Sequence, residues 1–496
     1  MRDHQNPFVP SVAPAPLDFA PLREATLGAN GARVRSRGTH LRKARPIALR
    51  RWIASLALVA AGCGDTLVDH LADPALLDLC GAGQSFCGGV CVAESPTSCG
   101  PGCADCTAGL PANAGGICTA SRTCDFECAP GFLRSGGQCV RATAVATGFL
   151  HTCALIAGGG VKCWGANDRG QIGNGTTSDS FTPVDVSLPA AATVIATGYA
   201  HSCALVAGAV WCWGDNTTGE LGDGTTINRS SPVQVAGISG ATALAAGGDS
   251  PPTPYGHTCA VVSGGAVWCW GFNQWGQLGN GSATPMQATS PVQVVGLTGA
   301  TAVATGGRHT CALAGGAVWC WGANDSGQLG DGSSSQQQPS PVSVTLASPT
   351  FIATGQNHTC ATTPSGLWCW GLNLSGQVDP GVTTSPFTQP HAPNLGGGLN
   401  AIRTAAGRAH TCALEPPTGL KCFGANNAGQ LTGSTNKVDV TLLAPGTAGE
   451  IAAGGDHTCA LTGDGGIQCW GANDRGQLGN GQTGPPVATP AYVSGR

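Results

Sequence analysis

The sequence predicts an all-β protein, a seven-bladed β-propeller preceded by a small disulfide-rich module. The first observation is the motif H-[TS]-C-A followed by C-[WF]-G, which occurs seven times between Gly148 and Arg496. The second is its spacing of 47 to 56 residues, typical of a blade made of several short strands. The third is a glycine-rich composition, 78 of 496 residues, which suits a chain that turns often. The motif histidines are His151, His201, His257, His309, His358, His410 and His457.

The motif continues as W-G-A-N-D-R-G-Q-I-G-N-G from Trp164, and similar segments begin at Trp213, Trp321 and Trp470. These segments resemble the regulator of chromosome condensation repeat family. The resemblance implies seven blades of four strands each over residues 142–496. The fifth and sixth copies depart from the pattern, at 376–380 and at Phe423, and we expect irregular loops there.

Charge limits the possible partners. Charged residues make up 10% of the chain, against about 25% in an average soluble domain. The net charge is −4 and the pI is near 6.2, so the chain has no basic footprint for nucleic acid. We therefore expect no nucleic-acid partner.

Residues 1–62 are predicted to be a signal region, although the true translation start is open and Val34 is an alternative. A basic run precedes the apolar run Trp52–Ala61, and Cys63 follows in a segment that resembles a bacterial lipoprotein signal. Cys63 is the predicted lipidation site, and residues 63–79 are a tether. The apolar run is shorter than the ~20 residues that span a bilayer, so acyl chains would hold the protein at the outer membrane or cell surface. The alternative is an ordinary secretory signal.

The cysteines support an oxidising compartment. There are 25; without Cys63, ten lie in residues 80–139 and fourteen in the blades, and both sets are even. We predict one disulfide per blade: Cys153–Cys163, Cys203–Cys212, Cys259–Cys269, Cys311–Cys320, Cys360–Cys369, Cys412–Cys422 and Cys459–Cys469.

Turn chemistry agrees with these pairs. If Cys203 lies opposite Cys212, then Ala207 and Gly208 form a two-residue hairpin turn. Where the cysteines are ten residues apart, the hairpin has a three-residue loop with glycine third, as in 157–159; residues 416–418 break this rule. A metal or redox site is disfavoured, because no blade pair has C-x-x-C spacing.

Tryptophans flank the second cysteine of most blades and are predicted to point away from the disulfide and pack between blades. Trp211 and Trp213 are one such pair. A sugar-binding platform or a light-absorbing cluster is the alternative. Trp275 lies in a turn and is a candidate exposed contact.

The motif histidines are predicted to be structural, with each imidazole hydrogen-bonded to the blade backbone. A ring of histidines could also bind metal or transfer protons, but a propeller spreads equivalent residues around its axis. No catalytic constellation stands out, and the Asn-Asp-x-Gly segments lack the spaced acids of a calcium loop. We expect no enzyme activity, no cofactor and no metal.

Two further expectations concern the ends of the ring. The strand near Ala142 repeats the string at 300–306, and we expect it to pair beside the terminal strand and close the ring. Residues 80–139 form a disulfide-rich module whose end resembles an epidermal-growth-factor-like domain. Its connectivity is left open, and Cys103 with Cys106 could instead be half of a zinc site.

Function must come from what differs between blades. The variable inserts are 249–256, 282–289, 333–338, 380–396 and 434–446, and the candidate ligand contacts are Tyr255, Trp275, Phe387 and His391. The first hypothesis is a monomeric, surface-anchored, non-enzymatic module that binds a protein or glycan. The alternative is a secreted inhibitor similar to a β-lactamase inhibitor of this family. An unrecognised hydrolase or lyase is the third, and export would separate the chain from a cytosolic GTPase.

Overall fold

The computed structural model describes residues 84–87, 90–93, 105–119, 121, 123–249, 255–395, 401–415, 419–433, 437–440, 448–463 and 465–495. The predicted signal region, Cys63 and the tether lie outside these residues, and so does the 416–418 loop. Among the described residues, no helix has the length and apolar character needed to cross a membrane.

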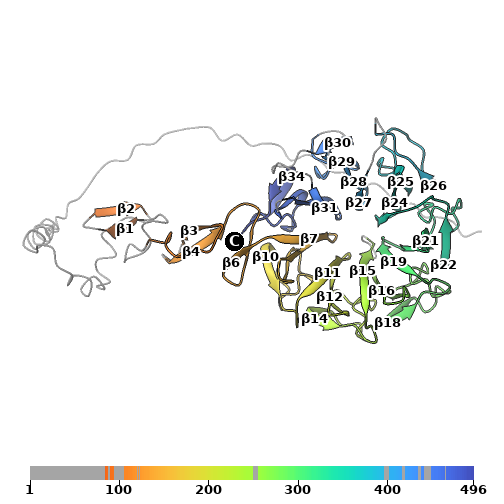
Figure 1. Ribbon diagram of the computed structural model, residues 1–496, viewed down its shortest axis with the longest axis horizontal. Coiled ribbons are helices and arrows are strands. Elements are labelled where there is room, and N and C mark those ends of the chain that lie inside the picture. The colour runs from red at the N-terminus through yellow and green to blue at the C-terminus, as the bar shows by residue number, and fades with distance from the viewer. Residues whose placement is uncertain are drawn as a thin grey trace, which may run out of the picture. The chain divides into compact units, whose positions relative to one another are not determined.

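Residues from Ala142 onward form seven four-stranded antiparallel sheets, so the predicted fold class is confirmed (Figure 1). Each sheet is one blade and uses four consecutive strands. The strands of blade 1 are β7 (Ala142–Thr147), β8 (His151–Ile156), β9 (Val161–Gly165) and β10 (Ser180–Val186); of blade 2, β11 (Ala192–Thr197), β12 (His201–Val206), β13 (Ala209–Gly214) and β14 (Arg229–Gln234); of blade 3, β15 (Ala241–Gly248), β16 (Gly256–Val262), β17 (Val267–Phe272) and β18 (Gln287–Gln293); of blade 4, β19 (Ala300–Thr305), β20 (His309–Ala314), β21 (Ala317–Ala323) and β22 (Gln337–Val344); of blade 5, β23 (Phe351–Thr354), β24 (His358–Thr363), β25 (Gly366–Gly371) and β26 (Phe387–His391); of blade 6, β27 (Arg403–Ala406), β28 (His410–Glu415), β29 (Gly419–Gly424) and β30 (Lys437–Val440); of blade 7, β31 (Ala448–Ala453), β32 (His457–Thr462), β33 (Ile467–Asn473) and β34 (Gly484–Tyr492).

The central hairpin of each blade has the register that the cysteines predict. In blade 2, Cys203 lies opposite Cys212 and Val206 opposite Ala209. The turn between them is Ala207 and Gly208, with φ of 51° and 80°, as a two-residue hairpin turn requires. In blade 1 the loop has three residues, and its third, Gly159, has φ 83°.

Every blade carries its predicted disulfide. The seven bonds join cysteines 9 or 10 residues apart, with Cα atoms 4.1 Å apart in each case. Their sulfurs lie in the core, since twelve of these cysteines are 0% exposed and the other two, Cys153 and Cys422, are 1% exposed. By the loop-entropy model, a loop this short stabilises the fold by roughly 2–3 kcal/mol.

The tryptophan after the second cysteine forms the core between blades. Trp213 is fully buried and packs with Val161, Ile172 and Val186 of the preceding blade. The predicted packing is therefore confirmed for this position, where blade 6 has the equally buried Phe423. The tryptophan before the cysteine behaves differently: Trp211 is only partly buried and covers the edge of the same cluster.

The ring does not close in the predicted way. β7 pairs only with β8 of its own blade, and the terminal strand β34 pairs only with β33. Blades 7 and 1 instead meet as other neighbouring blades do, through a shared hydrophobic cluster around Trp164. The expectation of a shared strand was wrong because each blade already contains its own four strands.

The described residues of the module before the propeller form small hairpins: β1 (Gln84–Cys87) with β2 (Val90–Ala93), β3 (Ala114–Cys118) with β4 (Cys124–Cys128), and β5 (Leu133–Ser135) with β6 (Gln138–Val140). Disulfides join Cys106 to Cys124 and Cys128 to Cys139, and Cys118 is also disulfide-bonded. The zinc alternative is therefore wrong for Cys106. Leu133 packs in the same cluster as Val493 at the end of the chain.

Candidate functional site: the mouth of the central channel

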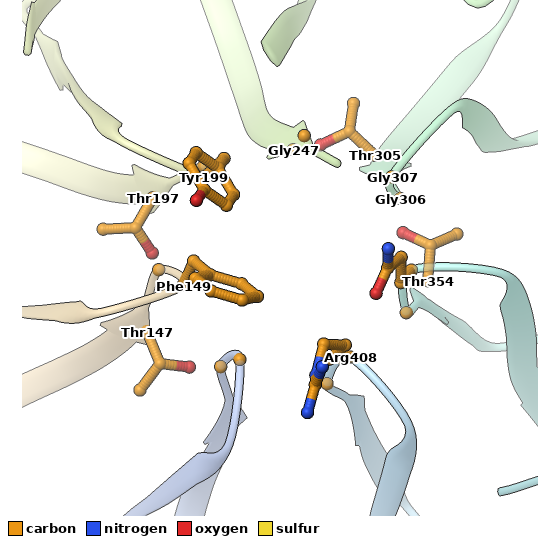
Figure 2. Close-up of a pocket in the computed structure, with 18 of the residues that line it drawn as sticks. Thr147, Phe149, Thr197, Tyr199, Gly247, Thr305, Gly306, Gly307, Thr354 and Arg408 are labelled. Carbon is orange, nitrogen blue, oxygen red and sulfur yellow. The ribbon is translucent and has the colours of Figure 1, made fainter. Parts of the chain in front are cut away.

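The seven turns between the first and second strands of the blades surround a cavity of about 110 Å³ (Figure 2). We call this opening the channel mouth, and the end of the blades on which it lies the mouth face. Because the strands alternate in direction, the connections between third and fourth strands lie on the mouth face too. The hairpin turns such as 207–208 lie on the opposite face. The described parts of the predicted inserts 249–256, 282–289 and 333–338 therefore belong to the mouth face.

Glycines form the wall of the channel for a steric reason. In blade 4, a Cβ on Gly306 would collide with the imidazole of His309 and with the carbonyl oxygen of Gly355 in the next blade. The same two kinds of neighbour, the motif histidine of the same blade and a glycine carbonyl of the next blade, surround Gly148, Gly198, Gly355, Gly407 and Gly454. The glycine before each motif histidine thus lets neighbouring blades approach closely around the channel.

Each motif histidine reaches the next blade. The Nε2 of His257 lies 2.9 Å from the hydroxyl of Thr310, which donates to the carbonyl of Gln277 at 2.9 Å. The indole of Trp321 donates to that carbonyl as well, at 2.9 Å. The remaining histidine–hydroxyl pairs are His151–Ser202, His201–Thr258, His309–Thr359, His358–Thr411, His410–Thr458 and His457–Thr152, at 2.8 to 3.0 Å.

The last of these pairs completes a circle of hydrogen bonds through all seven blades. Because each hydroxyl gives its proton to a carbonyl, it must accept a proton from the imidazole, so Nε2 carries the hydrogen. Burial lowers the pKa of His257 to about 3 and of His358 to about 4, so both rings are neutral at pH 7. The structural role was predicted, but the partner is a hydroxyl of the next blade and not the blade's own backbone.

The residue after each wall glycine differs between blades and gives the mouth its chemistry. Phe149 and Tyr199 lie side by side with ring centroids 4.7 Å apart, and Arg408 lies across the opening (Figure 2). Gln356 also lines the mouth, whereas blades 3, 4 and 7 have a second glycine there, Gly248, Gly307 and Gly455. The scaffold is thus repeated around the ring, and the mouth is not.

A cross-blade cluster lies beside the mouth. The guanidinium of Arg308 lies 4.9 Å from the ring centre of Trp275 and forms ion pairs with Asp249 at 3.1 Å and Asp325 at 3.5 Å. Gln356 donates to Asp249 from a third blade. These contacts hold a tryptophan and an arginine in fixed positions, and both residue types are enriched at the centres of protein interfaces.

Blade 2 places two acids beneath this surface. Asp215 is 3% exposed and Glu220 is 1% exposed. Glu220 accepts from the backbone and hydroxyl of Thr218, at 2.9 and 2.6 Å, and from the backbone of Gly256 at 3.2 Å. Burial, followed by repulsion from Asp215, raises the pKa of Glu220 to about 7. The sequence signal for this site was the glutamate in place of a repeated glutamine.

The four predicted contact residues have different environments. Tyr255 is half-buried just before β16, the second strand of blade 3, and its ring centroid lies 4.2 Å from that of Phe272. Trp275 belongs to the arginine cluster described above and is half-buried. Phe387 packs against the cores of two blades, so its ring has a structural role.

His391 is also tied to its own blade. Its Nε2 lies 2.7 Å from the buried carboxylate of Asp379, and its ring stacks on Phe387 at 4.4 Å. Because β26 is the fourth strand of blade 5, Phe387 and His391 do not reach the channel mouth, and Tyr255 and Trp275 do not line its cavity either. Among the described residues, no group of three or more His, Cys, Asp or Glu side chains is placed to hold a metal ion.

Repeated scaffold residues around a non-repeated mouth define a propeller of the binding-scaffold class. The chain belongs to the regulator of chromosome condensation (RCC1) repeat family. The family's models match 159–205, 207–250, 264–313 and 315–362, and also 142–171, 300–328, 350–377 and 450–477, together about half of the chain.

Curated relatives match over short segments. The chain is 34% identical over 89 residues to mouse Protein RCC2, covering 18% of this chain and 17% of that protein. It is 44% identical over 93 residues to the human probable E3 ubiquitin-protein ligase HERC3, covering 18% of this chain and 9% of that protein. The match thus spans less than a fifth of either relative.

Solved structures share the fold. Human WBSCR16 matches with a TM-score of 0.59 at 20% identity, covering 67% of this chain and 94% of that one. Yeast RCC1 (Prp20), in a structure with Kap60, matches with a TM-score of 0.58 at 22% identity, covering 71% and 85%. At this identity the likeness shows the propeller architecture alone.

Proposed function

We propose that this chain is an exported, non-enzymatic binding propeller that holds a protein partner on its mouth face. The observation that carries the proposal is the contrast between a scaffold repeated in every blade and mouth residues that differ from blade to blade. Phe149, Tyr199, Trp275, Arg308 and Arg408 are among the aromatic and arginine side chains of that face. Such side chains contribute most of the free energy in protein interfaces.

Exposed apolar side chains support the choice of face. Leu374, Met286 and Ile227 are 80%, 61% and 59% exposed, and all three lie in connections between third and fourth strands, on the mouth face. Two large apolar side chains, Val295 and Ile402, lie in connections that open on the opposite face. A protein partner fits an extended surface of this kind better than a small ligand does.

Export and anchoring complete the proposal. Disulfides buried in every blade require an oxidising environment for folding. We further propose that Cys63 is acylated and holds the protein at the outer membrane or cell surface. Intact mass should then show a chain that begins at Cys63 with its acyl groups, and Cys63→Ser should leave the membrane fraction. A Cys63→Ser protein that stays with the membrane would contradict the anchor.

The test of the binding face replaces mouth residues with the residues found at the equivalent positions of another blade. Tyr199→Gln and Trp275→Ser introduce the residues found at the same positions in blade 5, Gln356 and Ser375. Full-length protein carrying both changes should capture its extracytoplasmic partner at least about ten-fold less well than the wild type. Ile402→Thr, on the opposite face, is the matched control.

The outcomes of this capture experiment are distinct. Loss of the partner only in the opposite-face variant, or equal capture by all three proteins, would contradict the proposal. An enzyme partner whose activity falls on binding would identify the propeller as an inhibitor. A purified glycan that binds with the same dependence on Tyr199 and Trp275, in the absence of any protein partner, would overturn the choice of a protein ligand.

A further inference from the structure

Blade 2 departs from the other blades at two buried positions beneath the mouth face. Asp215 and Glu220 belong to the segment W-G-D-N-T-T-G-E, in which the other blades have an apolar residue and a glutamine. The equivalents of Asp215 are Ala166, Phe272, Ala323, Leu372, Ala425 and Ala472, and those of Glu220 are Gln171, Gln277, Gln328, Gln377, Gln430 and Gln477.

The two acids are unfavourable for the fold. Burial raises the pKa of both carboxyl groups, and the charge of Asp215 raises that of Glu220 further. Six blades build the same turn with an apolar residue and a neutral glutamine, so the scaffold does not need the acids. Buried acids that occur in only one of seven equivalent turns are candidates for a functional role.

The charge of Asp215 is only partly compensated. Its Oδ1 has no hydrogen-bond donor among the described residues, although Asp215 is only 3% exposed. The nearest cation is the guanidinium of Arg169, 4.0 Å from that oxygen. Arg169 lies equally far, 4.0 Å, from Asp168, so it is beyond hydrogen-bonding distance of both.

The phenol of Tyr199 lies within electrostatic range of Asp215. Burial and then the negative charges of Asp168, Asp215 and Asp249 raise the pKa of the Tyr199 phenol, so these groups act on one small region of the mouth. Tyr199 itself packs on Phe149. Carboxylates beside the face of aromatic rings attract ammonium and guanidinium groups.

The charge of the propeller favours the same kind of ligand. Residues 142–496 contain ten lysines and arginines and sixteen aspartates and glutamates, a net charge of −6. The value of −4 for the whole chain conceals this, because the first 63 residues contain ten basic and three acidic residues. A basic partner would be attracted to the propeller at long range.

We propose that Asp215, Glu220 and the ring of Tyr199 form a receptor for a lysine or arginine side chain that a protein partner presents to the mouth face. This inference rests on the proposed function, because it assigns the chemistry of the partner at one place on that face. The cation would approach the free oxygen of Asp215 with its apolar stem against the rings of Tyr199 and Phe149. Arg169 would move aside or share the carboxylate.

The test replaces the two acids with the residues found at the equivalent positions of the other blades. Asp215→Ala and Glu220→Gln restore what other blades carry, so both variants keep the turn while removing the charge. Asp331→Asn is the matched control, since it removes one charge at a position where Asn174, Asn280 and Asn480 stand in other blades. Near-ultraviolet circular dichroism checks that all variants retain the native fold.

The probe is a fluorescent peptide with three lysines, measured by anisotropy with full-length protein in physiological salt. The wild type and Asp331→Asn should bind it equally, and the double variant Asp215→Ala, Glu220→Gln about ten-fold more weakly or not at all. The same peptide with acetylated lysines or with glutamates should not bind. Equal binding of the acetylated peptide, equal binding by the double variant, or no binding of the lysine peptide would overturn the inference.

A competition experiment separates this inference from the proposed function. The lysine peptide should displace the captured partner from the wild type, and the double variant should capture less of it. If capture depends on Tyr199 and Trp275 but neither the peptide nor the double variant changes it, the cationic receptor is wrong and the binding face stands. If capture is independent of all these residues, both are wrong.

Discussion

Each motif histidine connects two blades through the proton on its Nε2. The imidazole of His257 donates to the hydroxyl of Thr310 in the next blade, and this hydroxyl donates to the carbonyl of Gln277. The same carbonyl also accepts a hydrogen bond from the indole of Trp321, which lies in the blade of Thr310. All of these hydrogen-bonding groups are buried, so each must find its partner within the protein. The repeated sequence H-[TS]-C is therefore a requirement of the contact between blades.

Removing one hydroxyl tests this contact. Thr310→Val keeps the shape of the side chain but leaves the Nε2–H of His257 without an acceptor, and should lower the free energy of unfolding by about 1–3 kcal/mol. The control, Thr301→Val, changes an exposed threonine of the same blade and should have almost no effect. Chemical denaturation followed by tryptophan fluorescence measures both. Equal effects of the two changes would contradict the role given to the hydroxyl.

Glu220 gives a pH-dependent prediction. Its folded pKa, about 7, lies above the ordinary 4.5, so the folded state binds more protons between these values and loses stability as the pH rises through them. Glu220→Gln should therefore stabilise the protein at pH 8, by up to about 3 kcal/mol, and have little effect at pH 4.5. Unfolding curves at the two pH values measure this. Destabilisation by Glu220→Gln at pH 8 would contradict it.

At the scale of the blade, the sequence predicted the hairpins because local chemistry determines them. Cysteine spacing and turn residues gave the register of Cys203 with Cys212 and the turn at Ala207, and both are confirmed. The tryptophan after the cysteine was also predictable, from alternation along a strand. The partner of each histidine was not, because the hydroxyl lies about one blade away in the sequence and only the packing of two blades brings it close.

The candidate site was predictable only in part for the same reason. Trp275 was recognised because it replaces a small or polar residue in a turn, and the structure places it beside Arg308. Phe387 was predicted to be a ligand contact, and the structure shows its half-buried ring packed against two neighbouring cores, which the sequence of one blade does not reveal. Asp215 and Glu220 were overlooked, although comparison between blades would have singled them out.

The disulfide of a blade should stabilise that blade locally. Replacing both Cys311 and Cys320 with alanine removes a bond that closes a short loop and should lower the free energy of unfolding by roughly 2–3 kcal/mol. Hydrogen exchange should increase chiefly in β20 and β21, with little change in distant blades. Uniform loss of protection over all seven blades would show that the bonds do not act within single blades.

For the whole molecule, the ring closes without a shared strand, so the seam between blades 7 and 1 resembles the other seams. His457 contacts Thr152 across it as the other histidines contact their neighbours, and the backbone of Gly455 donates to Gly148 at 3.3 Å. Arg475 adds an ion pair with Asp179, at 2.7 Å, that crosses the same seam and lowers the pKa of this carboxyl. Closure depends on the fit between blades.

The ring of neutral histidines makes the whole propeller sensitive to acid. The folded pKa of His151 and His457 is about 3, below the ordinary 6.5, so the unfolded chain binds more protons in this window. Stability should fall as the pH drops below about 6, by up to roughly 1.4 kcal/mol per pH unit for each histidine. Thermal unfolding between pH 7 and pH 4 measures it. A melting temperature that stays constant over this range would show that the histidines are not held neutral.

The molecule therefore combines a uniform scaffold with a mouth that differs from blade to blade. The same turn carries Phe149 in blade 1, Tyr199 in blade 2, Gln356 in blade 5 and Arg408 in blade 6. Since these differences lie on one face, a partner can recognise the propeller in a single orientation. The scaffold fixes the positions of these side chains and the variable turns supply their chemistry.

Hydrogen exchange of the propeller with and without its captured partner tests this claim most directly. The partner should protect the mouth turns at 148–150, 198–200 and 407–409 and leave the turns at 207–208 and 315–316 unchanged. Protection of 207–208 and 315–316, with the mouth turns unaltered, would contradict the assignment of the binding face.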